Sequence, residues 1–115
     1  MGKSVTRRIA KKQPDLLLFD GHDCVSALKA LGEDNRVRIM GLLMDAPLGV
    51  CEIARRLGST HYNVSKHLRI LREAGLLEVE KSGRERLYVV PGKIRRSRAH
   101  LRVLDLGCCS FQFDE

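Results

Sequence analysis

The sequence contains no tryptophan, and phenylalanine and tyrosine together make up only 4% of its 115 residues. Proteins that bind single-stranded nucleic acid stack the bases on exposed aromatic rings. Tyr62 and Tyr88 alone would form a poor platform of this kind, so we do not expect this chain to bind a single strand by stacking.

Long apolar runs are also absent. The only apolar run near the N-terminus is Leu16–Phe19, which is shorter than the roughly 7 to 15 apolar residues of a secretory signal. No stretch approaches the ~20 apolar residues that a membrane-spanning helix needs. We therefore expect a cytoplasmic protein that has no membrane partner.

The residue patterns of common enzymes are missing as well. We find no glycine-rich phosphate loop, no spaced pair of carboxylates and no CxxC motif of thiol oxidoreductases. The four histidines are scattered along the chain, which argues against a histidine-based metal site. We expect one of them, His67, to pack against the protein or to face a phosphate. Four cysteines in a reducing cytoplasm are not expected to form a disulfide framework. The sequence thus predicts a protein that is not an enzyme.

Positive charge is what the sequence has in excess. Lysine and arginine number 21 against 14 acidic residues, which gives a net charge of +7 and points to a polyanionic partner. The length indicates a single domain. We expect a basic mobile arm over residues 1–15, a folded domain over 16–106 and a cysteine-containing tail over 107–115. The arm could be a disordered tail or could touch DNA.

Two short helical patterns follow one another with a break of about three residues. In Val50–Leu57 the apolar residues recur at i, i+3, i+4 and i+7. Gly58 can end this helix, and Ser59 or Thr60 can cap the next one. The second helix ends near Ala74 and is expected to bury Val64, Leu68 and Leu71. This order predicts a helix-turn-helix.

The outward face of the second helix is polar, and it carries no acidic residue before Glu73. Its side chains are of a size that reaches base edges and phosphates. Alternating segments at 77–80 and 87–89 then flank a turn at 81–84, which predicts a basic hairpin. A solvated helix face and a hairpin that only aids solubility are the alternatives. The candidate DNA-binding residues are Ser59, Thr60, His61, Tyr62, Asn63, Ser65, Lys66, Arg69, Lys81, Arg84 and Arg86.

Together these segments resemble the ArsR/SmtB family of bacterial transcriptional repressors. The resemblance runs through the family's leading segment, scaffold helix, recognition helix and wing, at Leu28–Leu43, Val50–Leu57, Val64–Leu77 and Lys81–Val90. It implies a mainly α fold, a winged helix-turn-helix with a two-stranded wing, that is dimeric through its terminal helices. It further implies a homodimeric repressor that binds palindromic duplex operator DNA and is released by a soft metal, a metalloid or a thiol-reactive signal.

Two other functions remain open beside this one. The chain could be a winged-helix DNA-binding regulator that senses no metal, either because it senses redox state or because it has no ligand. It could also be a winged helix that binds another protein.

The segment after Pro91 and Gly92 has the spacing of a last helix, with Ile94, Ser97, Leu101 and Leu104 on one side. In the resembled family the terminal helices build the dimer interface. The residues that the resemblance assigns to that interface are Leu28, Leu31, Ile94, Leu101 and Leu104.

The cysteines are the candidates for sensing chemistry. Cys108 and Cys109 are adjacent, so their Cα atoms lie ~3.8 Å apart, below the ~4.4 Å lower limit of ordinary disulfides. We therefore expect them to act as thiolate ligands for a soft ion, or as thiols that each pair with another cysteine. Cys24 is expected to pack on the apolar face of its helix.

Cys51 lies at the start of the scaffold helix, where the helix dipole favours a thiolate. The resemblance places a soft-metal site of the CVCDL type at this point, but Gly49 stands where that motif has its first cysteine. A site here would need the C-terminal pair as well. The candidate ligands are thus Cys51, Cys108 and Cys109, with As(III) or a soft divalent metal as inducer and with no tightly bound cofactor; packing alone is the alternative.

Overall fold

The computed structural model describes residues 21–98 and 101–113, which belong to two compact units. One unit consists of residues 26–91, and the other contains the residues up to 25 together with those from 92 onward. The boundary falls within the first helix, α1, which spans Gly21–Leu31. The expected basic arm at 1–15 lies outside the described residues.

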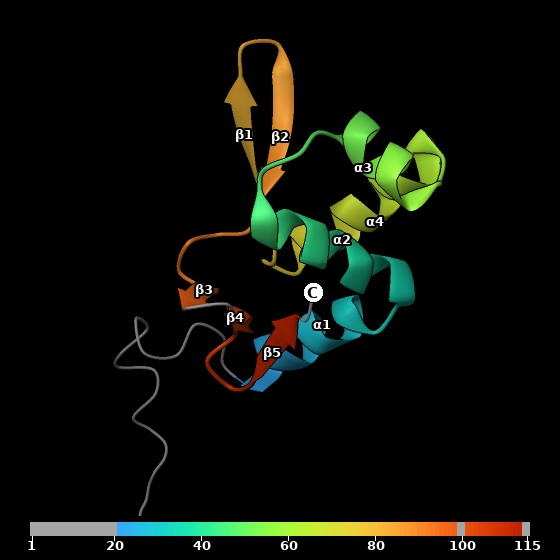
Figure 1. Cartoon of the computed structure of the whole chain (residues 1–115). Helices are drawn as coiled ribbons and strands as arrows, with labels where there is room; N and C mark the ends of the chain where they lie inside the picture. The colour runs from blue at the N-terminus through green and yellow to red at the C-terminus, as the bar shows by residue number, and fades with distance from the viewer. Residues whose placement is uncertain (1–20, 99–100, 114–115) are drawn as a thin grey trace, which may run out of the picture. The chain divides into compact units, whose positions relative to one another are not determined.

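The unit of residues 26–91 has the order of elements that the sequence predicts, and it is a winged helix-turn-helix (Figure 1). None of the helices in the described part of the chain has the length and apolar character needed to cross a membrane. The elements of the unit of residues 26–91 that follow α1 are α2 (Asp34–Asp45), α3 (Val50–Leu57), α4 (His61–Glu73), β1 (Glu78–Ser82) and β2 (Glu85–Val89).

The inward faces of these helices build the core. Val64, Leu68 and Leu71 are fully buried, as the helical spacing of α4 predicts. Burial of one such side chain stabilises the fold by about 1.5–3 kcal/mol. Because α4 is held by this apolar stripe, its opposite face is fixed toward solvent. The other large, fully buried side chains described in this unit are Ile39, Met40, Leu43, Ile53 and Leu76.

Strands β1 and β2 form the wing, an antiparallel hairpin that extends away from the helices of its unit (Figure 1). The last strand pair is Ser82 with Glu85, so the connection is the two-residue turn Gly83-Arg84. Gly83 has φ +64°, a conformation that glycine adopts without strain. The turn is thus shorter than the expected one at 81–84, because Lys81 still pairs with Arg86.

A short bridge joins the wing to the loop that precedes α3. The N–H of Leu48 donates to the carbonyl oxygen of Tyr88 at 3.3 Å, and the N–H of Tyr88 donates back at 2.8 Å. These two hydrogen bonds tie the base of the wing to the start of the helix-turn-helix.

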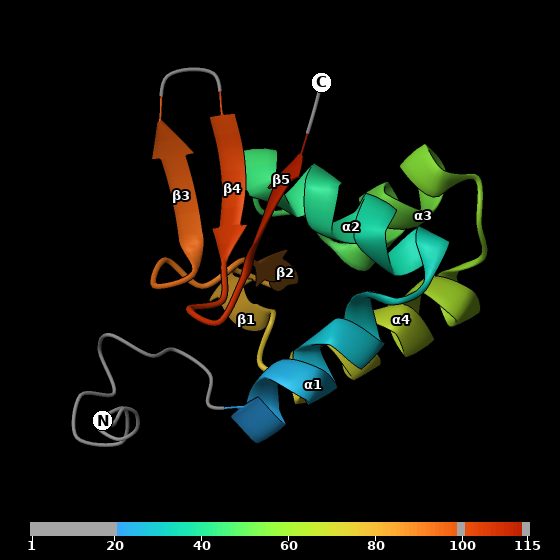
Figure 2. The same cartoon turned by 90° about the horizontal axis from the view of Figure 1, so that it is seen from below.

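The other unit contains a three-stranded antiparallel sheet in the order β3-β4-β5 (Figure 2). The prediction of a helix after Pro91 is therefore wrong. The spacing of Ile94, Leu101 and Leu104 fits a helix, but three apolar residues over eleven positions are weak evidence for one, and a sheet satisfies the backbone through neighbouring strands. The strands are β3 (Arg95–Arg98), β4 (Leu101–Asp105) and β5 (Ser110–Phe113).

Most of the residues expected at the dimer interface are not exposed as that role requires. Ile94 and Leu104 are fully buried and Leu31 is 7% exposed, so these residues offer little surface to a partner protomer. Leu101 begins β4, not a helix. Of the expected contact residues whose side chains are described, Leu28 alone is exposed, at 43%.

Candidate nucleic-acid interface and cysteine group

The turn between α3 and α4 sets the direction of the second helix. Gly58 ends α3 with φ +66°, and its left-handed conformation brings the N–H of Ser59 to the carbonyl oxygen of Ala54 at 3.0 Å. Thr60 is the N-cap of α4, because its Oγ1 accepts a hydrogen bond from the N–H of Asn63 at 3.0 Å. Of the two expected caps, the structure selects Thr60.

The expected reading residues lie together on the exposed side of α4. Tyr62, Ser65, Lys66 and Arg69 are spaced by three or four residues and are all exposed, as are His61 and Asn63 in the first turn. Tyr62 is 70% exposed, and the Nζ of Lys66 lies 5.4 Å from the centroid of its ring. This cation–π contact holds two candidate contact residues side by side.

The positive charge of this face is not neutralised within the described residues. No ion pair to Lys66 or Arg69 is formed there, and the first turn of α4 carries no acidic residue. On α3, by contrast, Arg55 and Arg56 both pair with Glu52. The hydrogen bond from Arg55 and then that from Arg56 lower the pKa of Glu52 to about 2. The two helices thus differ, and only α4 presents free cations.

The opposite side of α4 is attached to the α1–α2 corner through His67. Its Nδ1 lies 3.3 Å from Nη1 of Arg36 and 3.9 Å from Oε1 of Glu33. Glu33 also caps α2, accepting from the N–H of Arg36 at 3.1 Å. His67 is therefore a packing residue rather than a phosphate-facing one. Sequence reasoning missed Glu33 and Arg36, although an acidic residue at the start of a helix is a recognised signal, because it stabilises the positive end of the helix dipole.

The wing carries its cations close together and exposed. Lys81 lies directly opposite Arg86 in the hairpin register, and Arg84 is in the turn. Two like charges in opposite positions of an antiparallel pair disfavour the hairpin when no anion is near. The wing is thus suited to a position beside a phosphate backbone.

Cys51 is an exposed, free cysteine at the second position of α3. It lines a groove of about 640 Å³ between residues 47–52, which form the loop before α3 and its first turn, and the wing residues 85–87, which include Arg86. Solvent-borne reagents can reach this thiol.

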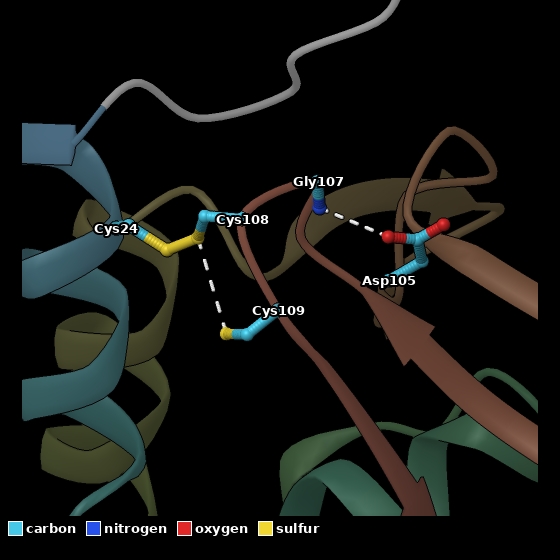
Figure 3. The surroundings of a disulfide bond; sticks show 5 residues. All are labelled: Cys24, Asp105, Gly107, Cys108 and Cys109. Carbon is cyan, nitrogen blue, oxygen red and sulfur yellow. Dashed lines mark hydrogen bonds between the residues drawn. A yellow bond between two sulfur atoms is a disulfide. The ribbon is translucent and has the colours of Figure 1, made fainter.

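The other three cysteines form a group in the second unit (Figure 3). Cys24 and Cys108 form a disulfide with a Cα–Cα distance of 6.6 Å, within the ordinary range. The Sγ atoms of Cys24, Cys108 and Cys109 all lie within 4.8 Å of one another. Cys24 is buried as expected, but the expectation that it only packs is wrong, and the group forms without Cys51. Pairing of Cys108 with another cysteine was one of the alternatives that the sequence left open.

Comparison with known proteins identifies relatives of this chain. Residues 33–79 match the family model described as bacterial regulatory protein, arsR family. Over 78 residues the chain is 31% identical to the cadmium resistance transcriptional regulatory protein CadC homolog of Staphylococcus aureus, covering 67% of this chain and 64% of that protein. These relatives are named as regulators of transcription, not as enzymes.

Solved structures give the same result for the fold. An ArsR-like transcriptional regulator from Rhodococcus sp. RHA1 is 32% identical, with a TM-score of 0.59 over 62% of this chain and 67% of that one. A homodimeric winged helix-turn-helix DNA-binding domain from Mycobacterium bovis is 25% identical, with a TM-score of 0.60 over 77% of each chain. The chain spans between about half and two thirds of the length of the first curated relatives.

Proposed function

Because this chain belongs to the ArsR family of bacterial regulatory proteins, we propose that it is a transcriptional repressor that binds palindromic duplex DNA as a homodimer. The observation that carries this proposal is the exposed face of α4, where polar and cationic side chains lie without a neutralising carboxylate among the described residues. A duplex would meet no acidic side chain in the first three turns of this helix.

The geometry supports one mode of binding. The second helix of a helix-turn-helix lies in the major groove, and residues in its N-terminal part contact base edges. We propose that Tyr62, Ser65, Lys66 and Arg69, which lie on the exposed face of α4, make these contacts. The wing cations then lie beside the phosphate backbone or the minor groove.

Dimer formation is supported by the relative from Mycobacterium bovis, which is described as homodimeric. In this chain α1 exposes two apolar side chains one turn apart, Val25 at 51% and Leu28 at 43%. Large apolar side chains exposed on one face of a helix are typical of an interface. We place the dimer contact on this face of α1, because Ile94 and Leu104 are buried.

Selection of tight-binding duplexes from a random pool, followed by light scattering, tests the proposal. We expect a dimer that selects two inverted half-sites about 10 base pairs apart, and single-stranded competitors that do not displace the duplex. The change Leu28→Glu should give a monomer with weakened DNA binding, whereas Lys29→Glu, also exposed on α1, should leave the dimer intact. A wild-type monomer at micromolar concentration, with and without DNA, would exclude this geometry.

We expect the wing arginines to contribute affinity more than sequence preference, because a hairpin tip meets phosphates. Replacement of Arg84 or Arg86 with alanine should weaken binding to all duplexes about equally. It should also reduce the slope of log affinity against log salt concentration by about 0.9 for each phosphate that the variant no longer binds. Glu85→Gln in the same hairpin is the control, and it should not reduce this slope. An altered consensus with an unchanged salt slope would contradict this role.

The signal that releases the protein from DNA is proposed to be a thiophilic ion or an oxidant that acts on cysteine. The CadC homolog is named for cadmium resistance, and three cysteines of this chain lie close together. The disulfide between Cys24 and Cys108 favours redox sensing as a second candidate. Release of a bound duplex on titration with Cd(II), As(III) or diamide distinguishes the two signals, and lack of release by all three would refute both.

A further inference from the structure

The group formed by Cys24, Cys108 and Cys109 can exist in two chemical states, one with a disulfide and one with three free thiols. Cys24 and Cys108 are joined as a disulfide, and the Sγ of Cys109 lies 3.9 Å from that of Cys108 (Figure 3). All three sulfur atoms fall within 4.8 Å of one another, and among the residues that the structure describes no histidine and no carboxylate belongs to the group. It is therefore a set of sulfur ligands alone.

The fold holds the two neighbouring cysteines at a tight turn between β4 and β5. Gly107 adopts φ +89°, and its N–H donates to the carboxylate of Asp105 at 2.9 Å. The N–H of Leu106 donates to the carbonyl oxygen of Cys109 at 2.9 Å. These hydrogen bonds hold the backbone on both sides of Cys108, and none of them involves its sulfur.

The distances suit a single ion when the sulfurs are free. A metal–thiolate bond of about 2.3 Å places three sulfurs of a trigonal site about 4.0 Å apart. Sulfurs that already lie within 4.8 Å reach this arrangement by small rotations of their side chains. Cys108 is exposed and Cys109 is half-buried, so an ion can enter from solvent.

The disulfide removes this capacity, because a sulfur bonded to another sulfur is no longer a thiolate ligand. Oxidation therefore leaves only Cys109 of the three. We propose that Cys24, Cys108 and Cys109 form a soft-ion site that is open when reduced and closed by the Cys24–Cys108 disulfide when oxidised. Any effect of this disulfide on DNA binding rests on the proposed function, whereas the binding of an ion by the three cysteines does not.

Two steps lead from the oxidised protein to the ion-bound one, and a small dithiol serves as the reductant in the first. The dithiol transfers two electrons and two protons to the disulfide, giving the thiols of Cys24 and Cys108 and the oxidised, cyclic form of the dithiol. Arsenous acid, As(OH)₃, then exchanges its three hydroxyl groups for three thiolates, and the three thiol protons leave in three water molecules. Three As–S bonds form and three As–O bonds break, with no change in oxidation state.

The test uses arsenite on the full chain, once reduced and freed of reductant under anaerobic conditions and once oxidised with diamide. We expect native mass spectrometry to show one arsenic per reduced chain and none on the oxidised chain. Cys24→Ser, Cys108→Ser and Cys109→Ser should each weaken binding by about tenfold or more. Cys51→Ser is the matched control and should bind as the wild type does.

Alkylation of the wild-type protein provides a measurement that needs no substitution. Bound arsenite should protect Cys24, Cys108 and Cys109 from iodoacetamide and leave Cys51 reactive. Equal binding by the reduced and oxidised chains, protection of Cys51, or wild-type affinity in Cys24→Ser would overturn the proposal. If arsenite binds as expected while no duplex is bound in either state, the site stands and the proposed function fails.

Discussion

Replacing Ser65 and Arg69 together with alanine is expected to abolish the preference for the selected duplex while leaving general DNA affinity in place. Both side chains are exposed on α4, and the buried stripe of that helix does not depend on them. A good base contact contributes about 1–3 kcal/mol of discrimination, and a dimer makes each such contact twice. Each of the two replaced residues should thus lower the specific affinity by between about thirtyfold and about twenty-thousandfold.

Fluorescence anisotropy with the selected duplex and with an unrelated duplex measures this change. Arg38→Ala on α2 is the control, because it removes the same charge from an exposed position on another helix. A double variant that keeps the wild-type ratio of the two affinities would show that α4 does not read the bases. Thermal unfolding of the variant should match that of the wild type, since no core side chain changes.

Reduction of the Cys24–Cys108 disulfide is expected to lower the free energy of unfolding by about 4–5 kcal/mol. The bond links residues that are 84 positions apart, and closing a loop of this length removes much of the entropy of the unfolded chain. Urea unfolding with and without reductant measures the difference. The expected decrease is a large share of the roughly 5–15 kcal/mol that stabilises a typical domain.

Two cysteine variants control this measurement. Cys108→Ser should unfold at the same urea concentration with and without reductant, near the midpoint of the reduced wild type. Cys51→Ser should respond to reductant as the wild type does, because Cys51 is free. A wild-type midpoint that reductant does not move would mean that the bond contributes nothing to stability.

Most of the unit of residues 26–91 could be predicted from sequence because its signals are local. The inward stripe Val64, Leu68 and Leu71 follows the helical period, and the ends of α3 and α4 coincide with Gly58 and a threonine cap. Such features involve residues a few positions apart. The exposed face of α4 then follows from the buried one.

The sheet of the second unit could not be predicted in the same way. Arg95–Arg98 becomes a strand because Leu101–Asp105 pairs with it, and that strand is paired in turn by Ser110–Phe113. Pairing of this kind depends on a partner strand and not on the period of one segment. The same limit applies to Cys24, whose partner is 84 residues away and is identified only by the folded chain.

The bridge between Leu48 and Tyr88 has a consequence for how two protomers would fit a DNA helix. Since the wing is hydrogen-bonded to the loop before α3, a tilt of the hairpin relative to α4 would break bonds that are already formed. The two hydrogen bonds therefore oppose a change in the angle between the wing and the helix-turn-helix of each protomer. We therefore expect adjustment to DNA of a different twist, or withdrawal from it, to come from rotation of one whole winged helix-turn-helix against that of the partner protomer.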